Sequence, residues 1–232
     1  MTLQVEALDV FHGAVRTLRD VNLSVARGEI LCLMGRNGAG KTTVLRTIMG
    51  VLRPAAGRVR LDGRILSDLP AHDIPRLGIA HVPQGRRLFS DLTVRENLEI
   101  GLMVRNSPQR VLDFALGLFP LLAERMGQRS GTLSGGEQTM LAVARAICAE
   151  PSVILLDEPT EGLMPSAIAT IRSALLRLRG EGVAVLLVEQ RAEAVLAMAD
   201  RVAFLDRGHV VAETPVDGLR ADRTLLRRYA GI

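Results

Sequence analysis

One short segment, Gly35–Thr42, constrains this chain more than any other. Its sequence GRNGAGKT fits the pattern G-x-x-x-x-G-K-[ST], with an apolar stretch, Glu29–Met34, before it and a helical pattern, Gly40–Met49, after it. Glycines permit a tight turn whose amides point inward, and the helix N-terminus adds partial positive charge. The segment therefore predicts a loop that binds phosphate groups. The alternative is a glycine-rich turn with an exposed lysine.

The charged and hydroxyl side chains of this loop have separate expected roles. We expect Lys41 to neutralise the β- and γ-phosphates and the Thr42 hydroxyl to ligate Mg²⁺. Lys41 is the only lysine among 29 Lys and Arg residues, and a compact ammonium suits a tight loop better than a broad guanidinium. The residues expected to line the phosphates are Gly35, Arg36, Asn37, Gly38, Ala39, Gly40, Lys41, Thr42 and Thr43.

A second apolar stretch ends in two acids. Val153–Leu156 is followed directly by Asp157 and Glu158. Ligands of α/β sheets bind at the carboxyl edge, where a buried strand emerges and charge first appears. We therefore expect Asp157 to hold Mg²⁺ and Glu158 to accept a proton from an attacking water or to orient it. The alternative is a solvated loop.

Apolar stretches alternate with helical patterns along most of the chain. This alternation predicts an α/β fold with a mostly parallel sheet covered on both faces. Between residues 85 and 150 helical spacing dominates, starting at the capping box Thr93-Val-Arg-Glu96 and continuing through Leu116, which indicates an inserted helical segment. The expected strands are Leu3–Val10, Val21–Val25, Glu29–Met34, Gly57–Leu61, Ile79–Val82, Val153–Leu156, Val183–Val188 and Val202–Leu205. The expected helices are Gly40–Met49, Asp73–Leu77, Gly135–Ala149, Pro165–Arg179 and Ala192–Met198.

Composition excludes several other classes of protein. The net charge of +4 comes from arginines scattered among acids, which is not the footprint of a nucleic-acid-binding protein. No apolar run approaches the roughly 20 residues that cross a bilayer, and the first residues lack a secretory signal. Cys32 and Cys148 lie inside apolar runs without metal or redox spacing. We expect a cytosolic protein with buried thiols.

The segment Leu133-Ser-Gly-Gly-Glu137 carries a family resemblance. Placed about twenty residues before the strand that ends in Asp-Glu-Pro-Thr, it resembles the signature of ABC ATPases. The chain resembles this family over its whole length. The resemblance implies one ABC-type P-loop domain over residues 1–232, with an N-terminal antiparallel β subdomain. The ATP-binding core would comprise residues 1–84 and 151–232, and the helical signature subdomain residues 85–150.

The resemblance also implies a site shared between two subunits. Ser134, Gly135 and Gly136 of one subunit would cap the γ-phosphate of Mg-ATP held by the phosphate loop of a second ABC ATPase subunit. Gln84 would contact Mg²⁺ or the attacking water. Residues 84–107 resemble the surface that receives an integral-membrane permease; Leu88 and Phe89 would suit an apolar groove there or be buried core. The protein would then lie in the cytoplasm, peripheral on the inner face of the cell membrane.

Three positions depart from the commonest pattern of the family. His12 stands at the base-stacking aromatic position, Met164 where many relatives have Asp, and Gln190 at the switch position usually held by His. With Val82–Arg86, Thr160–Ser166 and Leu187–Gln190, these details resemble the ATPases of branched-chain amino acid and urea or short-chain amide importers. Gln84 and the Thr160–Gly162 run favour the urea type. Such importers work indirectly with a solute-binding protein.

Two other functions are weighed against a transport ATPase. A soluble ABC ATPase in DNA repair or translation usually has a long coiled coil or two fused cassettes, and this chain has neither. A small-molecule kinase would leave Leu133–Glu137 without a role. We therefore expect the catalytic residues Glu158, Gln190 and Gln84 to hydrolyse ATP for transport, without a nucleic-acid partner.

Overall fold

The computed structural model describes residues 2–230, whose strands form two sheets. A four-stranded antiparallel sheet has the order β2-β1-β4-β5, and a six-stranded sheet has the order β10-β9-β3-β8-β7-β6. The strands of the first are β1 (Thr2–His12), β2 (Val15–Ala26), β4 (Ala56–Leu61) and β5 (Arg64–Ile65). Those of the second are β3 (Ile30–Met34), β6 (Ile79–Val82), β7 (Val153–Asp157), β8 (Ala184–Val188), β9 (Arg201–Asp206) and β10 (His209–Pro215).

The six-stranded sheet is parallel except at one edge. β6, β7, β8, β3 and β9 pair in parallel, and β10 pairs antiparallel with β9. Every residue of β3, β7 and β8 is buried, as in strands covered on both faces. The expected mostly parallel sheet is confirmed. β10 was not predicted, because this edge strand alternates exposed and half-buried residues and lacks a long apolar run.

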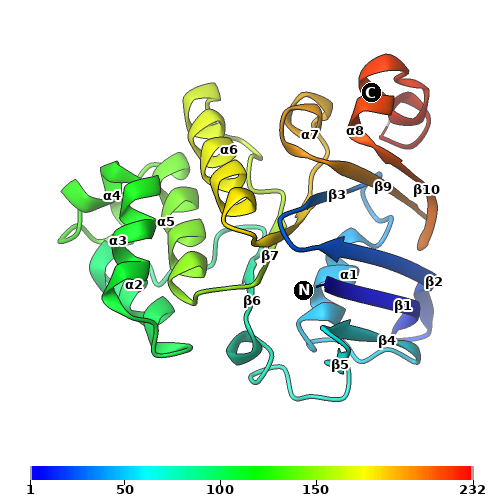
Figure 1. Cartoon of the computed structure of the whole chain (residues 1–232), viewed down its shortest axis with the longest axis horizontal. Coiled ribbons are helices and arrows are strands. Elements are labelled where there is room, and N and C mark those ends of the chain that lie inside the picture. The colour runs from blue at the N-terminus through cyan, green and yellow to red at the C-terminus, as the bar shows by residue number, and fades with distance from the viewer. Residues whose placement is uncertain (1, 231–232) are drawn as a thin grey trace.

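Alternate residues of β3 belong to two separate hydrophobic clusters. Ile30, Cys32 and Met34 pack in the cluster that contains the helices α5 (Gly135–Cys148), α6 (Pro165–Gly180) and α7 (Ala192–Met198). Leu31 and Leu33 pack in the cluster that contains the helix α1 (Lys41–Ile48) and the antiparallel sheet. Figure 1 shows these two layers on opposite sides of the parallel sheet. The helices are α1 (Lys41–Ile48), α2 (Val94–Met103), α3 (Gln109–Leu118), α4 (Pro120–Glu124), α5 (Gly135–Cys148), α6 (Pro165–Gly180), α7 (Ala192–Met198) and α8 (Val216–Ala221).

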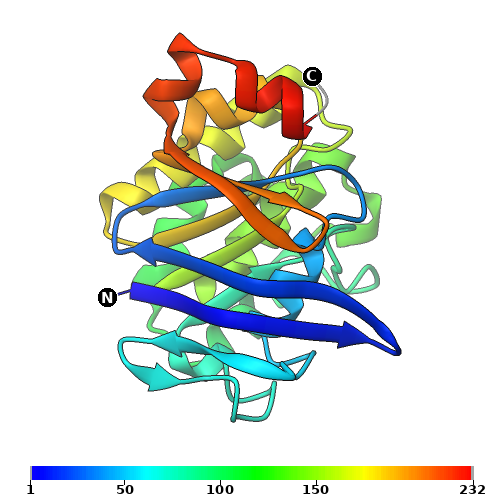
Figure 2. The same cartoon turned by 90° about the vertical axis from the view of Figure 1, so that its right-hand side faces the viewer.

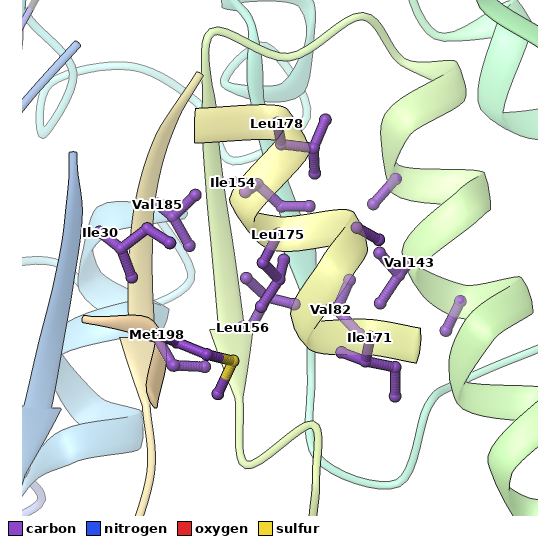
Figure 3. Packing of buried hydrophobic residues seen from close by; sticks show 14 of the residues in the cluster. Ile30, Val82, Val143, Ile154, Leu156, Ile171, Leu175, Leu178, Val185 and Met198 are labelled. Carbon is purple, nitrogen blue, oxygen red and sulfur yellow. The ribbon is translucent and has the colours of Figure 1, made fainter. Parts of the chain in front are cut away.

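Helix α6 lies against the centre of the parallel sheet. Its residues Ile171 and Leu175 face Leu156 of β7, while Val143 approaches from α5 (Figure 3). All four side chains are fully buried. Each such side chain contributes roughly 1.5–3 kcal/mol to folding through removal of apolar surface from water. This packing holds β7 and β8 rigidly, so that the loops after them start from fixed points.

The helices α2 to α5 gather at one end of the molecule, away from the antiparallel sheet (Figure 1). Thr93 and Glu96 form the expected capping box at the start of α2. The helical spacing expected through Leu116 comes from two helices, α2 and α3, with a break between them. Asn106 adopts a left-handed conformation with φ 52°, and Pro108 precedes α3. Proline has no amide hydrogen and disfavours a helical residue before it, so the chain breaks into α2 and α3.

The C-terminal part of the described chain packs over β9 and β10, where Figure 2 shows α8 and the last helical turn above the N-terminal hairpin. That turn, Leu226–Ala230, places Tyr229 with its ring centroid 5.8 Å from that of Phe204 in β9. The described residues contain no helix that is both long and apolar enough to span a membrane.

Candidate nucleotide site

A cavity of about 740 Å³ opens where β3, β7 and β8 end. It lies at the carboxyl edge of the parallel sheet, where ligands of open α/β folds bind. Its wall is strongly polar and comes from segments far apart in the sequence. The lining residues are Thr17, Asn37, Gly38, Gly40, Lys41, Thr42, Thr43, Gln84, Glu158, Glu161, Gly162, Glu189, Gln190 and Arg191.

The turn between β3 and α1 forms one wall of the cavity. A Cβ atom on Gly35 would lie 2.2 Å from the carbonyl oxygen of Leu205, so only glycine fits there. Gly40 precedes α1 with φ 111°, a left-handed conformation that favours glycine. No side chain caps this end of α1, so its first amides are available to an anion.

Lys41 is held inside this turn. Its Nζ donates hydrogen bonds to the carbonyl oxygens of Gly35 at 2.8 Å and Arg36 at 3.2 Å. Only 5% of the residue is exposed, so the alternative of a solvent-exposed lysine is wrong. Burial lowers the pKa of Lys41, while the nearby Glu158 and Asp157 carboxylates act in the opposite direction. The ammonium therefore sits at the cavity floor with its donors directed by the loop.

The two acids after the strand β7 differ in their surroundings. Asp157 is 3% exposed and its Oδ1 has no hydrogen-bond partner among the described residues. Burial raises the pKa of this carboxyl, and a hydrogen bond from Thr42 opposes that shift. An orphaned buried oxygen beside a hydroxyl is a donor set that Mg²⁺ prefers. The residues present therefore fit a magnesium ion held by Asp157 and Thr42.

Glu158 turns away from β7 into the cavity. It has φ 51°, a left-handed conformation that is strained for a residue with a side chain and that recurs at functional sites. Its amide is bound to the carbonyl oxygen of Val188 at 3.0 Å. Its Oε1 lies 3.9 Å from Nζ of Lys41. The strained turn thus points a carboxylate at the place where the phosphate loop would hold a γ-phosphate.

Gln190 and Gln84 each donate a side-chain hydrogen bond to a glutamate of the cavity wall. Nε2 of Gln190 donates to Asn37 Oδ1 at 2.9 Å and to the carboxylate of Glu158. Nε2 of Gln84 donates to Glu161 Oε2 at 2.9 Å. A carboxylate only accepts hydrogen bonds, so Glu161 takes the amino end of Gln84 and leaves its carbonyl oxygen free. The expected site residues that line this cavity are Asn37, Gly38, Gly40, Lys41, Thr42, Thr43, Gln84, Glu158 and Gln190. Gly35, Arg36, Ala39 and Asp157 are not on its wall.

The remaining expected site residues lie elsewhere on the chain. His12 ends β1 in the exposed turn before β2 and does not line the cavity. Ser134, Gly135 and Gly136 start α5, where Ser134 and Glu137 form a capping box. None of these three lines the cavity of the same chain. Adenine stacking by His12 and phosphate capping by the signature residues stay predictions.

A smaller cavity, of about 350 Å³, lies beside the helical layer. Apolar and small residues line much of it, including Phe89, Ile100 and Ala146. Phe89 is 51% exposed, and the guanidinium of Arg145 lies 5.4 Å from its ring centroid. Leu88 is half-buried and packs against the core instead. Of the two residues expected at a docking groove, only Phe89 lines it.

Sequence reasoning misses Glu161 and Glu189, which both line the large cavity. Glu189 directly follows the fully apolar β8. This is the same signal, charge at the end of a buried strand, that revealed Asp157. Glu161 gives no comparable signal, because only the folded chain brings it to Gln84.

Comparisons with known proteins agree with this geometry. Residues 18–161 match the family described as ABC transporter. The match spans more than half of the chain, which therefore belongs to the ABC transporter family. The predicted resemblance and the predicted fold class are confirmed.

The relatives define the protein more closely. The chain is 46% identical over 231 residues to the high-affinity branched-chain amino acid transport ATP-binding protein BraG of Pseudomonas aeruginosa, with 99% of both chains covered. It is 36% identical over 238 residues to the lipopolysaccharide export system ATP-binding protein LptB of Escherichia coli, with 99% of this chain and 97% of the relative covered. These similarities identify an ATP-binding, ATP-hydrolysing protein.

Solved structures show the same architecture. An ATP-binding subunit of an ABC transporter aligns with a TM-score of 0.86 and 28% identity, covering 97% of this chain and 94% of that one. The dimeric structure of a bacterial ABC transporter cassette aligns with a TM-score of 0.84 and 26% identity, covering 92% of this chain and 98% of that one.

Proposed function

We propose that this chain is the ATPase subunit of an importer for branched-chain amino acids. The observation that carries the proposal is the 46% identity to BraG over 99% of both chains. The 36% identity to LptB is lower over a similar span. The similarity to urea importers rests only on Gln84 and the Thr160–Gly162 run, so urea is an alternative solute in the experiment below.

The site residues divide the work of hydrolysis. Lys41 and the free amides of α1 would hold the phosphates, and Thr42, Asp157 and the carbonyl oxygen of Gln84 would hold Mg²⁺. The ion would neutralise phosphate charge. Glu158 takes the proton of the attacking water, since its carboxylate is oriented by the strained turn and by Gln190. In this structure the two N–H donors of Gln190 Nε2 are bonded to Asn37 and Glu158. Gln190 would hold the γ-phosphate by turning the donor now bonded to Asn37 toward it.

A second subunit completes the site. The cavity of one chain lacks Ser134, Gly135 and Gly136 on its wall, although these residues start a helix whose N-terminus favours an anion. A head-to-tail dimer brings them to the γ-phosphate bound by the partner chain. The dimeric cassette that this chain resembles supports such an arrangement.

The groove beside Phe89 receives the membrane permease. It combines an exposed aromatic ring with apolar and small residues from α2 and α5, as does an interface pocket that anchors a partner segment. Docking there holds the protein in the cytoplasm against the inner face of the membrane. The division of the chain into an ATP-binding core, residues 1–84 and 151–232, and a helical subdomain, residues 85–150, stays a prediction.

Reconstitution into liposomes tests the transport function. The chain is purified with its permease, and ATP turnover is measured with a solute-binding protein loaded with leucine, urea or ribose. We expect leucine to stimulate turnover and leucine to accumulate in the vesicles. Stimulation by urea alone would replace the proposed solute, and failure to co-purify with any membrane protein would contradict the transport role. Phe89→Asp should abolish co-purification, whereas Val51→Asp, another exposed apolar position, should not.

A further inference from the structure

A buried carboxylate joins the two loops that carry Glu158 and Gln190. Glu189 is only 2% exposed and follows the last residue of β8. Its Oε1 accepts hydrogen bonds from the hydroxyl of Thr160 and from the Thr160 amide at 3.3 Å. Its Oε2 accepts from the amides of Gln190 at 3.0 Å and Arg191 at 3.4 Å. Each oxygen therefore serves one loop.

This arrangement is costly as a structural device alone. All the donors to Glu189 are neutral, and within residues 2–230 no lysine or arginine forms an ion pair with it. A buried carboxylate without a cation loses several kcal/mol of hydration, which hydrogen bonds only partly restore. An apolar residue would fill this position after an apolar strand at lower cost. The charge of Glu189 is explained by the two loops that its carboxylate oxygens connect.

The connected loops meet again in the cavity. Thr160, itself fully buried, is two residues beyond Glu158. Gln190 is adjacent to Glu189 and donates its side-chain amide to Glu158. A closed circuit therefore runs from Glu158 through Thr160, Glu189 and Gln190 back to Glu158. Movement of either loop alone would break a buried hydrogen bond, so the two loops move together.

We infer that Glu189 is a positioning residue, which through Thr160 fixes the switch residue Gln190 against the catalytic Glu158. The inference rests on the proposed roles of Glu158 and Gln190, and adds the residue that aligns them. Although Glu189 lines the cavity, its role here rests on its hydrogen bonds to Thr160 and Gln190 and not on a contact with nucleotide. It acts by holding the backbone amide of Gln190 and the turn after Glu158 in a fixed position relative to each other.

Matched variants of Thr160 and Glu189 test this inference. Thr160→Val keeps the shape and removes the hydroxyl donor, whereas Thr160→Ser keeps the donor. Glu189→Gln replaces one of the two carboxylate oxygens by an amino group, so a single acceptor remains for the donors of two loops. We expect Thr160→Val and Glu189→Gln to lower kcat by about tenfold or more while KM for ATP changes less than about threefold, since the phosphate loop is untouched. Thr160→Ser should restore kcat to within about threefold of wild type.

A double-mutant cycle separates positioning from general stability. If Thr160 acts through Gln190, adding Thr160→Val to Gln190→Ala should lower kcat by less than about twofold further. Ser152→Ala, which removes a hydroxyl bond of 3.1 Å to the Gly78 carbonyl beside the other end of β7, should leave kcat unchanged. The affinity for a fluorescent ATP analogue, measured directly, should match wild type in every Thr160 and Glu189 variant.

The outcomes distinguish this inference from the proposed function. A wild-type kcat in both Thr160→Val and Glu189→Gln would overturn the positioning role, even when Glu158→Gln is inactive. If Thr160→Val lowers kcat by the same factor in wild type and in Gln190→Ala, the positioning role would also be overturned. Should Glu158→Gln itself turn over like wild type, the proposed catalytic roles would be wrong instead. Thermal unfolding of each variant shows that the comparison is made between folded proteins.

Discussion

The side-chain amide of Gln190 donates a hydrogen bond to the carboxylate of Glu158. These residues follow the neighbouring parallel strands β8 and β7. The bond therefore lies at the carboxyl edge of the sheet, where Gln190 also contacts Asn37 of the phosphate loop. An amide donor at this position stays neutral at all ordinary pH values, unlike the histidine common in the family. Under the proposed function this pairing would separate two tasks, with Glu158 accepting a proton and Gln190 holding and sensing the phosphate.

Replacement of Glu158 by Gln should trap the protein with ATP. The amide keeps the shape of the carboxylate but cannot accept the proton of water, so kcat should fall by about 100-fold or more. Nucleotide binding should persist, because Lys41 and the amides of α1 remain. Size-exclusion chromatography with Mg-ATP should show a dimer that is absent without nucleotide. A monomer with near wild-type turnover would exclude Glu158 as the base.

Variants of Gln190 should show that ATP turnover depends on its hydrogen-bond donor and not on proton transfer through this residue. Gln190→His should keep turnover within about tenfold, a barrier change under roughly 1.4 kcal/mol, and add a pH-dependent limb between about pH 6 and 7.5. Gln190→Ala should lower turnover much further, because no donor remains for the phosphate. Steady-state ATPase assays with the permease present measure all three proteins. An Ala variant as active as wild type would place the switch elsewhere.

Replacement of Lys41 by Arg should weaken ATP binding by about tenfold or more, because a guanidinium is too broad for the buried space of Lys41. The ammonium there is 2.8 Å from the Gly35 carbonyl oxygen and 5% exposed. Fluorescent-nucleotide titration gives the Kd. Arg46→Lys, at the far end of α1, is the control and should bind normally. Equal affinities for Lys41→Arg and wild type would show that the loop is wider than the structure indicates.

Removal of the Glu161 carboxylate should raise the Mg²⁺ concentration needed for half-maximal turnover. Without it nothing holds the amino end of Gln84, and the carbonyl oxygen loses its fixed direction. We expect a shift of about threefold to tenfold in Glu161→Ala, with less effect on kcat at saturating Mg²⁺. Glu161→Gln, which retains an acceptor, should lie between the two. An unchanged Mg²⁺ dependence in Glu161→Ala would show that Gln84 is oriented by other contacts.

His81 should make the protein less stable in acid. Burial lowers its pKa from 6.5 to about 4, and its Nε2 has no hydrogen-bond partner in the part of the chain that the structure describes. As the pH falls below 6.5 the unfolded chain binds a proton before the folded one does, so stability is lost between pH 6.5 and about 4. The loss reaches about 3 kcal/mol in the free energy of unfolding.

Urea unfolding of His81→Leu at a series of pH values measures this contribution. The variant should lack that part of the acid limb and match wild type more closely above pH 6.5. His72→Leu is the control, since the side chain of His72 is 74% exposed. A wild-type acid limb in His81→Leu would show that another group carries the pH dependence.

Local sequence signals predict the strands and the phosphate loop well. The apolar runs of β3, β7 and β8 are long enough and buried enough to be read directly. The edge strand β10 and the break between α2 and α3 escape that reading. An edge strand needs no apolar run, and a break marked by Pro108 and Asn106 competes with a helical pattern on both sides.

The sequence by itself determined the family and the positions at which chemistry is predicted. Lys41 and Thr42 were predicted from a glycine-rich loop that leads into a helix, and Asp157 and Glu158 from the end of a buried strand, because residue type and spacing carry the signal there. Only the tertiary structure decided how they are held. The circuit of Thr160, Glu189 and Gln190 and the contact of Gln84 with Glu161 join residues 29 to 77 positions apart in sequence. Such contacts depend on strand order and register, which no local pattern encodes.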